Sequence, residues 1–223
     1  MELSSEMQLR ESICEVGRRL YTKNLTVATD GNISVRLGPN RYLCTPSGVS
    51  KNDLTPQTII LADGRGERIT GQGKVTSEFF THLAAYEERP DVSSVIHAHP
   101  PKAIALTLAG LSLSEPVLPE VVCILGGIPT VPYTTPSTPK GADCIRPMTR
   151  QCNAMMLEQH GALTLGTDVF DALRKMEKIE HSAEILYAAH LLGRVQKLNT
   201  EQIRDLLEVR RNHGLKGPFF DNF

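Results

Sequence analysis

The segment Val95-Ile96-His97-Ala98-His99-Pro100 constrains the fold more than any other part of this chain. Its apolar residues are typical of a short β-strand, in which residues two apart point to the same face, so the imidazoles of His97 and His99 are predicted to lie side by side. A third histidine, His160, closes another apolar run just before Gly161. Three histidines with a free fourth position hold a catalytic zinc ion in proteins, whereas a structural zinc ion has four protein ligands. For the His-x-His pair alone, a chance pair in an exposed strand is the competing interpretation.

Composition and charge limit the class of protein. The chain has 223 residues, 40% of them hydrophobic, and a formal net charge of -1, which argues against binding to a nucleic-acid backbone. No apolar run approaches the length of a membrane span, and the N-terminus lacks the basic and apolar parts of a signal peptide. The five cysteines are scattered, without a Cys-x-x-Cys pair, which favours reduced thiols. We expect a single domain over residues 1–223, cytoplasmic, with no nucleic-acid or membrane partner.

Apolar periodicity predicts a mixture of helices and short strands. Helices are expected over about residues 5–22, from Thr76-Ser77 to Glu88, over about 102–109, from Asp168 to Gly193 and from Asn199 onward. Strands are expected over 33–37, 42–45, 59–61 and the His97 segment, and further short apolar runs lie at 117–125, 128–133 and 154–165. The early strands are joined by hairpin-length turns without a regular βαβ rhythm. This favours an α/β fold with an antiparallel or mixed sheet flanked by helices.

Two helix ends carry recognisable capping signals. Asp168 is placed as the N-cap of the long helix, and Asn199 with Gln202 forms the pattern of a capping box for the last one. The predicted inward stripe of the long helix consists of Ala172, Met176, Ile179, Ala183, Leu186 and Tyr187.

Three short motifs add polar groups that can contact a substrate. They are Asp30-Gly31-Asn32, Thr45-Pro46-Ser47-Gly48 and Thr76-Ser77-Glu78, and each taken alone is also explained by ordinary turn or capping chemistry. The hydroxyls of the third motif begin a helix, a position that favours anion binding. Glu78 becomes a group for proton transfer if its helix points at the histidines. His82, one turn further on, is either a neighbour of the site or a packing residue.

In these motifs the chain resembles members of the class II aldolase/adducin family, the group of L-fuculose-phosphate aldolase and L-ribulose-phosphate 4-epimerase. The similarity runs over nearly the whole chain, with five motifs in the family's order and at similar spacings. They are Gly31-Asn32-Ile33-Ser34, Thr45-Pro46-Ser47-Gly48, Thr76-Ser77-Glu78, His97-Ala98-His99 and Gln159-His160-Gly161.

The resemblance implies a three-layer α/β/α fold with a central, largely antiparallel sheet, assembled as a homotetramer with active sites at subunit interfaces. It implies Zn²⁺, or another divalent transition metal, on His97, His99 and His160. Glu78 would be the catalytic acid/base and, in the resting enzyme, a fourth metal ligand. The residues implied to bind the substrate phosphate are Gly31, Asn32, Ser47, Gly48, Thr76 and Ser77.

The implied activity is zinc-dependent cleavage of a phosphorylated ketose to dihydroxyacetone phosphate and an aldehyde. Zinc would act as a Lewis acid for the resulting enediolate, and Glu78 would exchange its proton. The lysines are dispersed and none sits in an obviously desolvated strand, which argues against a Schiff base. The alternatives are a sugar-phosphate 4-epimerase, a methylthioribulose-1-phosphate dehydratase or, outside enzymes, an adducin-like interaction module.

Two positions depart from the fuculose-phosphate aldolases. Glu120 stands six positions before the Gly126-Gly127 turn, where those enzymes have a tyrosine, and His213 replaces a second tyrosine next to Gly214. The family tyrosines reach the active site of a neighbouring subunit. The resemblance therefore implies that Glu120 and His213 act as catalytic groups across a subunit boundary, on a ketose phosphate other than fuculose phosphate, such as a 5-deoxy- or 5-methylthio-pentulose phosphate. The alternative is that Glu120 lies in an exposed turn and that His213 only caps the last helix before Gly214.

Overall fold

The computed structural model describes residues 3–214, and in this part of the chain eight strands form one sheet. Their order across the sheet is β4-β3-β2-β1-β5-β8-β7-β6. Their bounds are β1 (Asn32–Gly38), β2 (Arg41–Cys44), β3 (Ile60–Ala62), β4 (Arg68–Thr70), β5 (Ser94–Ala98), β6 (Thr130–Val131), β7 (Ala154–Leu157) and β8 (Gly161–Gly166). The β6–β7 pair is parallel, and the other neighbouring pairs are antiparallel. The expected largely antiparallel sheet is confirmed.

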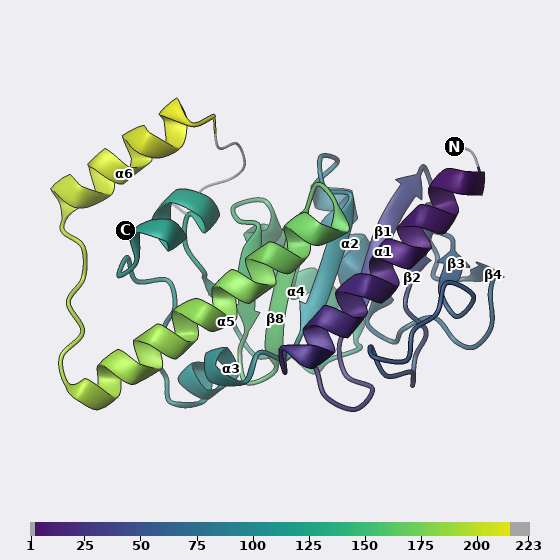
Figure 1. Ribbon diagram of the computed structural model, residues 1–223, viewed down its shortest axis with the longest axis horizontal. Helices are drawn as coiled ribbons and strands as arrows, with labels where there is room; N and C mark the ends of the chain where they lie inside the picture. Colours follow the sequence, from purple (N-terminus) through teal and green to yellow (C-terminus); the bar gives the residue numbers. More distant parts are fainter. Residues whose placement is uncertain (1–2, 215–223) are drawn as a thin grey trace.

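Helices cover both faces of this sheet, which gives the expected three layers (Figure 1). One face packs against α1 (Leu3–Thr22), α3 (Pro101–Leu108) and α5 (Val169–Leu192), and the other against α2 (Phe79–Glu88) and α4 (Pro139–Thr149). The π-helix η1 (Val121–Leu125) packs against α6 (Thr200–Asn212) to one side of the layers (Figure 1). None of the described helices is long and apolar enough to cross a membrane.

Strand alternation decides on which face the first histidine lies. In β5, Ile96 and Ala98 join the core under α1, α3 and α5. Val95 faces the other way and belongs to the core under α2 and α4. His97 has the same parity as Val95, so its side chain lies on the α2 side of the sheet, where it is 1% exposed.

Most predicted elements are present, with specific exceptions. The long helix begins after the N-cap Asp168, and the capping box at Asn199 is formed. Tyr187 is 43% exposed, so its predicted place on the inward stripe is wrong. Helix α4 was not predicted, because its internal Pro147 and its Gly141 are poor helix formers. Helix α2 follows the Thr76-Ser77-Glu78 motif as predicted and begins at Phe79, with Glu78 as its N-cap residue.

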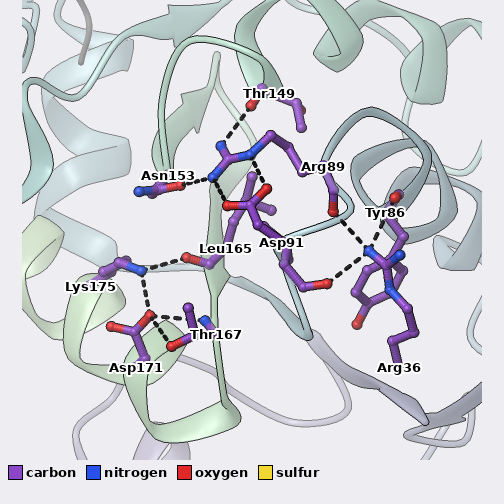
Figure 2. Close-up of polar contacts among 11 residues, drawn as sticks. Arg36, Tyr86, Arg89, Asp91, Thr149, Asn153, Leu165, Thr167, Asp171 and Lys175 are labelled. Atoms are coloured by element: carbon purple, nitrogen blue, oxygen red, sulfur yellow. Dashed lines mark hydrogen bonds and ion pairs between the residues drawn. The ribbon is translucent and has the colours of Figure 1, made fainter. Parts of the chain in front are cut away.

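A polar network ties several elements together at the end of the sheet away from the histidines (Figure 2). Arg89, at the C-terminal end of α2, forms a bidentate pair with Asp91, with N–O distances of 2.8 and 2.7 Å. It also donates to the backbone carbonyl of Thr149 and to the side-chain oxygen of Asn153. The guanidinium thus joins the ends of α2 and α4 to the segment that leads into β7.

Candidate active site and metal centre

Three imidazoles converge where the end of β5 meets the start of β8. His97 lies in β5, His99 follows that strand, and His160 stands in the turn that precedes β8. β5 and β8 pair antiparallel, with Ala98 opposite Ala162, which brings the three positions together. One ring nitrogen from each histidine lies within 4.8 Å of the others. The Nε2 atoms of His97 and His99 are 3.0 Å apart.

Gly161 is the residue that permits this convergence. A Cβ atom at this position would lie 2.5 Å from the carbonyl oxygen of Ala98 and 2.9 Å from ring carbons of both His97 and His99. Real Cβ atoms do not approach backbone so closely, so any other residue would push β8 or the imidazoles away. The Gln-His-Gly motif thus combines a ligand with the glycine that makes room for its neighbours.

His97 is held in one tautomer by its surroundings. Its Nδ1–H donates to the backbone carbonyl of Ala162 at 3.0 Å, which leaves the Nε2 lone pair facing the other two histidines. Burial lowers the pKa of His97 to about 3, so the ring is neutral near pH 7. A neutral imidazole with its free nitrogen directed into a cluster is the form that binds a metal ion.

Glu78 places a carboxylate beside the imidazoles. Its two oxygens lie 3.3 Å from Nε2 of His97 and 3.6 Å from Nε2 of His160, and Asn32 donates its side-chain N–H to Oε2 at 3.0 Å. Burial by itself raises the pKa of this carboxyl, but the two imidazoles and the Asn32 N–H outweigh it and lower the pKa. Glu78 is therefore a carboxylate at neutral pH, within reach of the same space as the histidine nitrogens.

This donor set fits a divalent metal ion. Three imidazoles with a carboxylate beside them match the open arrangement of catalytic zinc sites, and imidazole also suits other divalent transition metals. The second ring nitrogen of His97 is already bound by a backbone carbonyl, as in the outer sphere of known metal sites. His97, His99 and His160, with Glu78 beside them, are the residues that could hold the ion.

The six residues expected to bind phosphate line one cavity of about 270 Å³. Glu78 and His99 line the same cavity, so it opens directly onto the imidazole cluster. The six are Gly31, Asn32, Ser47, Gly48, Thr76 and Ser77. Gly31 and Gly48 have positive φ angles of 73° and 75°, and a side chain on Gly31 would meet the carbonyl oxygen of His97 at 2.9 Å. The cavity therefore joins hydroxyl groups to close backbone approach, which suits a phosphate.

Comparison with known proteins decides the family. The sequence model of one protein family, the class II aldolase and adducin N-terminal domain, matches residues 11–187. The chain belongs to this family.

Its relatives include lyases that act on sugar phosphates. It is 30% identical over 207 residues to a 3-oxo-tetronate 4-phosphate decarboxylase from Haemophilus influenzae, covering 91% of this chain and 97% of that protein. It is 29% identical over 213 residues to a 5-methylthioribulose-1-phosphate/5-deoxyribulose-1-phosphate aldolase from Escherichia coli, covering 94% and 98%. A solved L-fuculose 1-phosphate aldolase superposes with a TM-score of 0.83, at 25% identity over 92% of this chain and 96% of that one.

Lys51 is a buried group of this class II aldolase domain that sequence reasoning missed. It is 1% exposed, and its ammonium donates to the carbonyls of Thr29 at 3.1 Å and Val49 at 2.7 Å. Burial lowers its pKa to about 8. The expectation concerned lysines in desolvated strands, and Lys51 is desolvated in a loop instead, which strand patterns do not reveal. It ties together the two loops that carry Gly31 and Ser47.

Glu120 and His213 lie apart from the imidazoles within one chain. Glu120 is exposed and precedes η1, and His213 is exposed at the end of α6, where its Nδ1–H donates to the carbonyl of Val209 at 2.9 Å. Neither is among the residues that line the two cavities next to Glu78. Since η1 and α6 pack together, both residues belong to one surface unit of the class II aldolase domain.

Proposed function

We propose that this protein is a metal-dependent lyase that cleaves a ketose 1-phosphate to dihydroxyacetone phosphate and an aldehyde. The observation that carries the proposal is the position of Glu78, which borders both the three imidazoles and the cavity lined by hydroxyls and glycines. A sugar phosphate in that cavity would have its carbonyl end at the histidines. Family membership and the aldolase relatives support the same reaction class.

Each group has a distinct task in this reaction. When bound by His97, His99 and His160, a divalent metal ion would supply a Lewis acid for the carbonyl oxygen. Gly31, Ser47 and their neighbours would hold and orient the phosphate through N–H and O–H donors. The bond between C3 and C4 breaks, its electron pair stays on C3, and the C4 hydroxyl gives its proton to the Glu78 carboxylate as the aldehyde forms. Glu78 then delivers a proton to C3, which completes dihydroxyacetone phosphate.

The second candidate reaction is decarboxylation of a 3-oxo acid phosphate, favoured by the relative from Haemophilus influenzae. Loss of carbon dioxide from 3-oxo-tetronate 4-phosphate leaves the same three-carbon fragment, so Glu78 would serve both reactions. We favour the neutral aldehyde fragment because, among the described residues, no lysine or arginine lines either cavity beside Glu78. A substrate carboxylate would find no side-chain cation there. Epimerisation and dehydration remain the other outcomes on this fold.

Product analysis separates these reactions. The purified protein would be incubated with 5-deoxyribulose 1-phosphate, fuculose 1-phosphate and 3-oxo-tetronate 4-phosphate, with and without chelator. We expect triose phosphate and an aldehyde from a ketose 1-phosphate, loss of activity with chelator, and recovery on addition of Zn²⁺. Triose phosphate with carbon dioxide from the 3-oxo acid alone would assign decarboxylation. An adducin-like role would be supported by the absence of turnover and of bound metal.

The phosphate assignment has its own test. Thr76→Ala/Ser77→Ala should raise KM for the phosphorylated substrate by 10-fold or more, since a hydrogen bond to a charged group contributes roughly 1.5–3 kcal/mol. The matched measurement is turnover of the non-phosphorylated sugar, which should change far less. Equal losses on both substrates would assign these residues to structure.

The remaining parts of the proposal concern metal, assembly and location. We propose Zn²⁺ as the native ion, a homotetramer whose active sites are completed by Glu120 and His213 of a neighbour, and a cytoplasmic location without nucleic-acid or membrane partners. A closed ring joins unlike surfaces of adjacent subunits, which makes such sharing geometrically natural. Metal analysis and light scattering of the purified protein test the first two directly.

A further inference from the structure

One stripe of α2 and its N-cap residue forms a continuous chain of side-chain hydrogen bonds with one face of β1. Glu78, His82 and Tyr86 recur at the helix period of four, and Asn32 and Ser34 recur at the strand period of two. Asn32 contacts Glu78 at 3.0 Å and His82 at 2.5 Å. Ser34 contacts His82 at 2.7 Å and Tyr86 at 2.8 Å. This hydrogen-bond chain therefore alternates between helix and strand residues, and one end of it is the carboxylate of Glu78 beside the imidazoles.

The direction of every hydrogen bond follows from that carboxylate. An ionised carboxylate only accepts, so Asn32 directs its amide nitrogen to Glu78 and its amide oxygen to His82. Nε2 of His82 must then carry the hydrogen, which makes Nδ1 an acceptor for the hydroxyl of Ser34. Ser34 in turn accepts from the hydroxyl of Tyr86. His82 is 0% exposed, and burial lowers its pKa to about 4, so it stays neutral and keeps this tautomer.

The other end of the hydrogen-bond chain, at Tyr86, is buried in the protein. Tyr86 is 2% exposed, and the guanidinium of Arg36 lies over its ring at 4.7 Å from the centroid. Figure 2 shows the same guanidinium donating to the backbone carbonyl of Tyr86, and it also donates to the carbonyls of Arg89 and Val92. The chain is thus anchored at the C-terminal end of α2.

We propose that His82 is a positioning residue that fixes the amide of Asn32 and, through it, the carboxylate of Glu78. Without a donor at His82, the Asn32 amide is free to turn over and present its oxygen to Glu78, which repels the carboxylate from its working position. With the donor present, one N–H of Asn32 holds Glu78 beside the cavity that both residues line. Its catalytic consequence rests on the proposed function of Glu78, whereas the hydrogen-bond direction does not.

The first test compares His82→Leu with His82→Gln. Glutamine carries an amide N–H near the position of the imidazole Nε2, so it retains the donor that leucine lacks. We expect His82→Leu to lower kcat by about 10- to 100-fold, the usual effect of removing an outer-sphere partner, with KM within about threefold and metal content unchanged. His82→Gln should recover most of kcat. Equal losses in both variants, or a loss that follows metal content, would overturn the positioning role.

The second test uses the far end as a matched control. Tyr86→Phe removes one hydroxyl but keeps the ring over which Arg36 lies. Its effect on kcat should be no more than a few-fold, because the hydrogen bonds from Ser34 to His82 and from His82 to Asn32 remain and still fix the amide of Asn32. A loss equal to that of His82→Leu would mean that the stripe acts only through the packing of α2, and the proposal would fail.

The third test does not depend on any activity. Long-range ¹H–¹⁵N spectra of the histidine-labelled, metal-loaded protein report which ring nitrogen carries the hydrogen. We expect His82 as the Nε2–H tautomer at neutral pH. An Nδ1–H tautomer would overturn the assigned direction whatever reaction the protein catalyses. If the tautomer is as expected but Glu78→Gln retains full turnover, the proposed function fails and the hydrogen-bond chain stands.

Discussion

Two polar clusters lie at opposite ends of the same two strands, β5 and β8, and they differ in how their groups are satisfied. At the Arg89 end, Arg89 pairs with Asp91, and Lys175 pairs with Asp171 at 2.6 Å and donates to the carbonyl of Leu165 (Figure 2). Arg89 and Lys175 thus each have an anion and a backbone carbonyl from the chain itself. This cluster needs nothing further to be stable.

At the histidine end the ring nitrogens and a carboxylate lie around one shared space. The Nε2 atoms of His97 and His99 face each other at 3.0 Å, and Glu78 lies against two of the three rings. The hydrogen of His97 lies on Nδ1, so its Nε2 lone pair faces the other side chains of this cluster. Such a cluster is completed by a ligand, and a metal ion is the ligand that its donors fit. The comparison separates a cluster whose charges are paired within the chain from one whose ligand atoms could hold a metal ion.

The largest expected effect, on both metal content and turnover, comes from removing one imidazole of the histidine end. His97→Ala should lose bound metal and lower turnover by about 10³-fold or more, because a metal Lewis acid contributes several kcal/mol to the transition state. The protein should remain folded by circular dichroism. His190→Ala, an exposed histidine of α5, is the matched control and should change neither property. Full metal occupancy in His97→Ala would exclude His97 as a metal ligand.

Glu78→Gln should separate proton transfer from metal binding. The amide keeps the size of the carboxylate but cannot carry the proton, so kcat should fall by about 10²-fold or more. Metal content measured by elemental analysis should be largely retained because the three imidazoles remain. Turnover near the wild-type value would exclude Glu78 as the acid/base.

The buried His82 predicts a pH dependence of stability. Its pKa is lowered from 6.5 to about 4 in the folded protein, so the unfolded chain takes up a proton first as the pH falls. Stability is therefore fully present above pH 6.5 and declines towards pH 4, by about 3 kcal/mol from this residue. Urea unfolding of chelator-treated wild type and His82→Gln across this range measures the difference. Identical pH profiles would contradict the burial of a neutral imidazole.

Breaking the Arg89 end should affect stability without affecting the metal. Arg89→Met removes a bidentate pair and two further hydrogen bonds, and we expect a loss of about 2–3 kcal/mol in urea unfolding. Metal content per folded chain should stay at the wild-type level. Arg18→Met breaks an exposed ion pair with Glu15 and should change stability by less than about 1 kcal/mol. A drop in metal content for Arg89→Met would mean that the two ends are coupled.

The sequence predicts the histidine end better than its surroundings, for a physical reason. Alternation in β5 is a local pattern, so His97 and His99 could be placed side by side before any tertiary contact was known, and the three-histidine ligand set of zinc sites and the family motif added His160. The hydrogen bonds of His82 join residues 48 and 50 positions apart, and no local pattern carries such pairings. Helix α4 was not predicted, for the opposite reason. Its internal Pro147 disfavours a helix locally, whereas tertiary packing against α2 stabilises one.

The two ends also differ in whether one chain completes them, and mixed oligomers test this. Glu120 and His213 stand on the η1–α6 unit, away from the imidazoles of their own chain, so we expect each to act in the site of a neighbour. Glu78→Gln subunits, inactive in their own sites, would be reassembled with Glu120→Ala or His213→Ala subunits. Some boundaries then combine an intact Glu78 with an intact group from the neighbour, and activity should rise above that of either parent. A mixture that stays inactive after confirmed reassembly would confine the site to one chain, as at the Arg89 end.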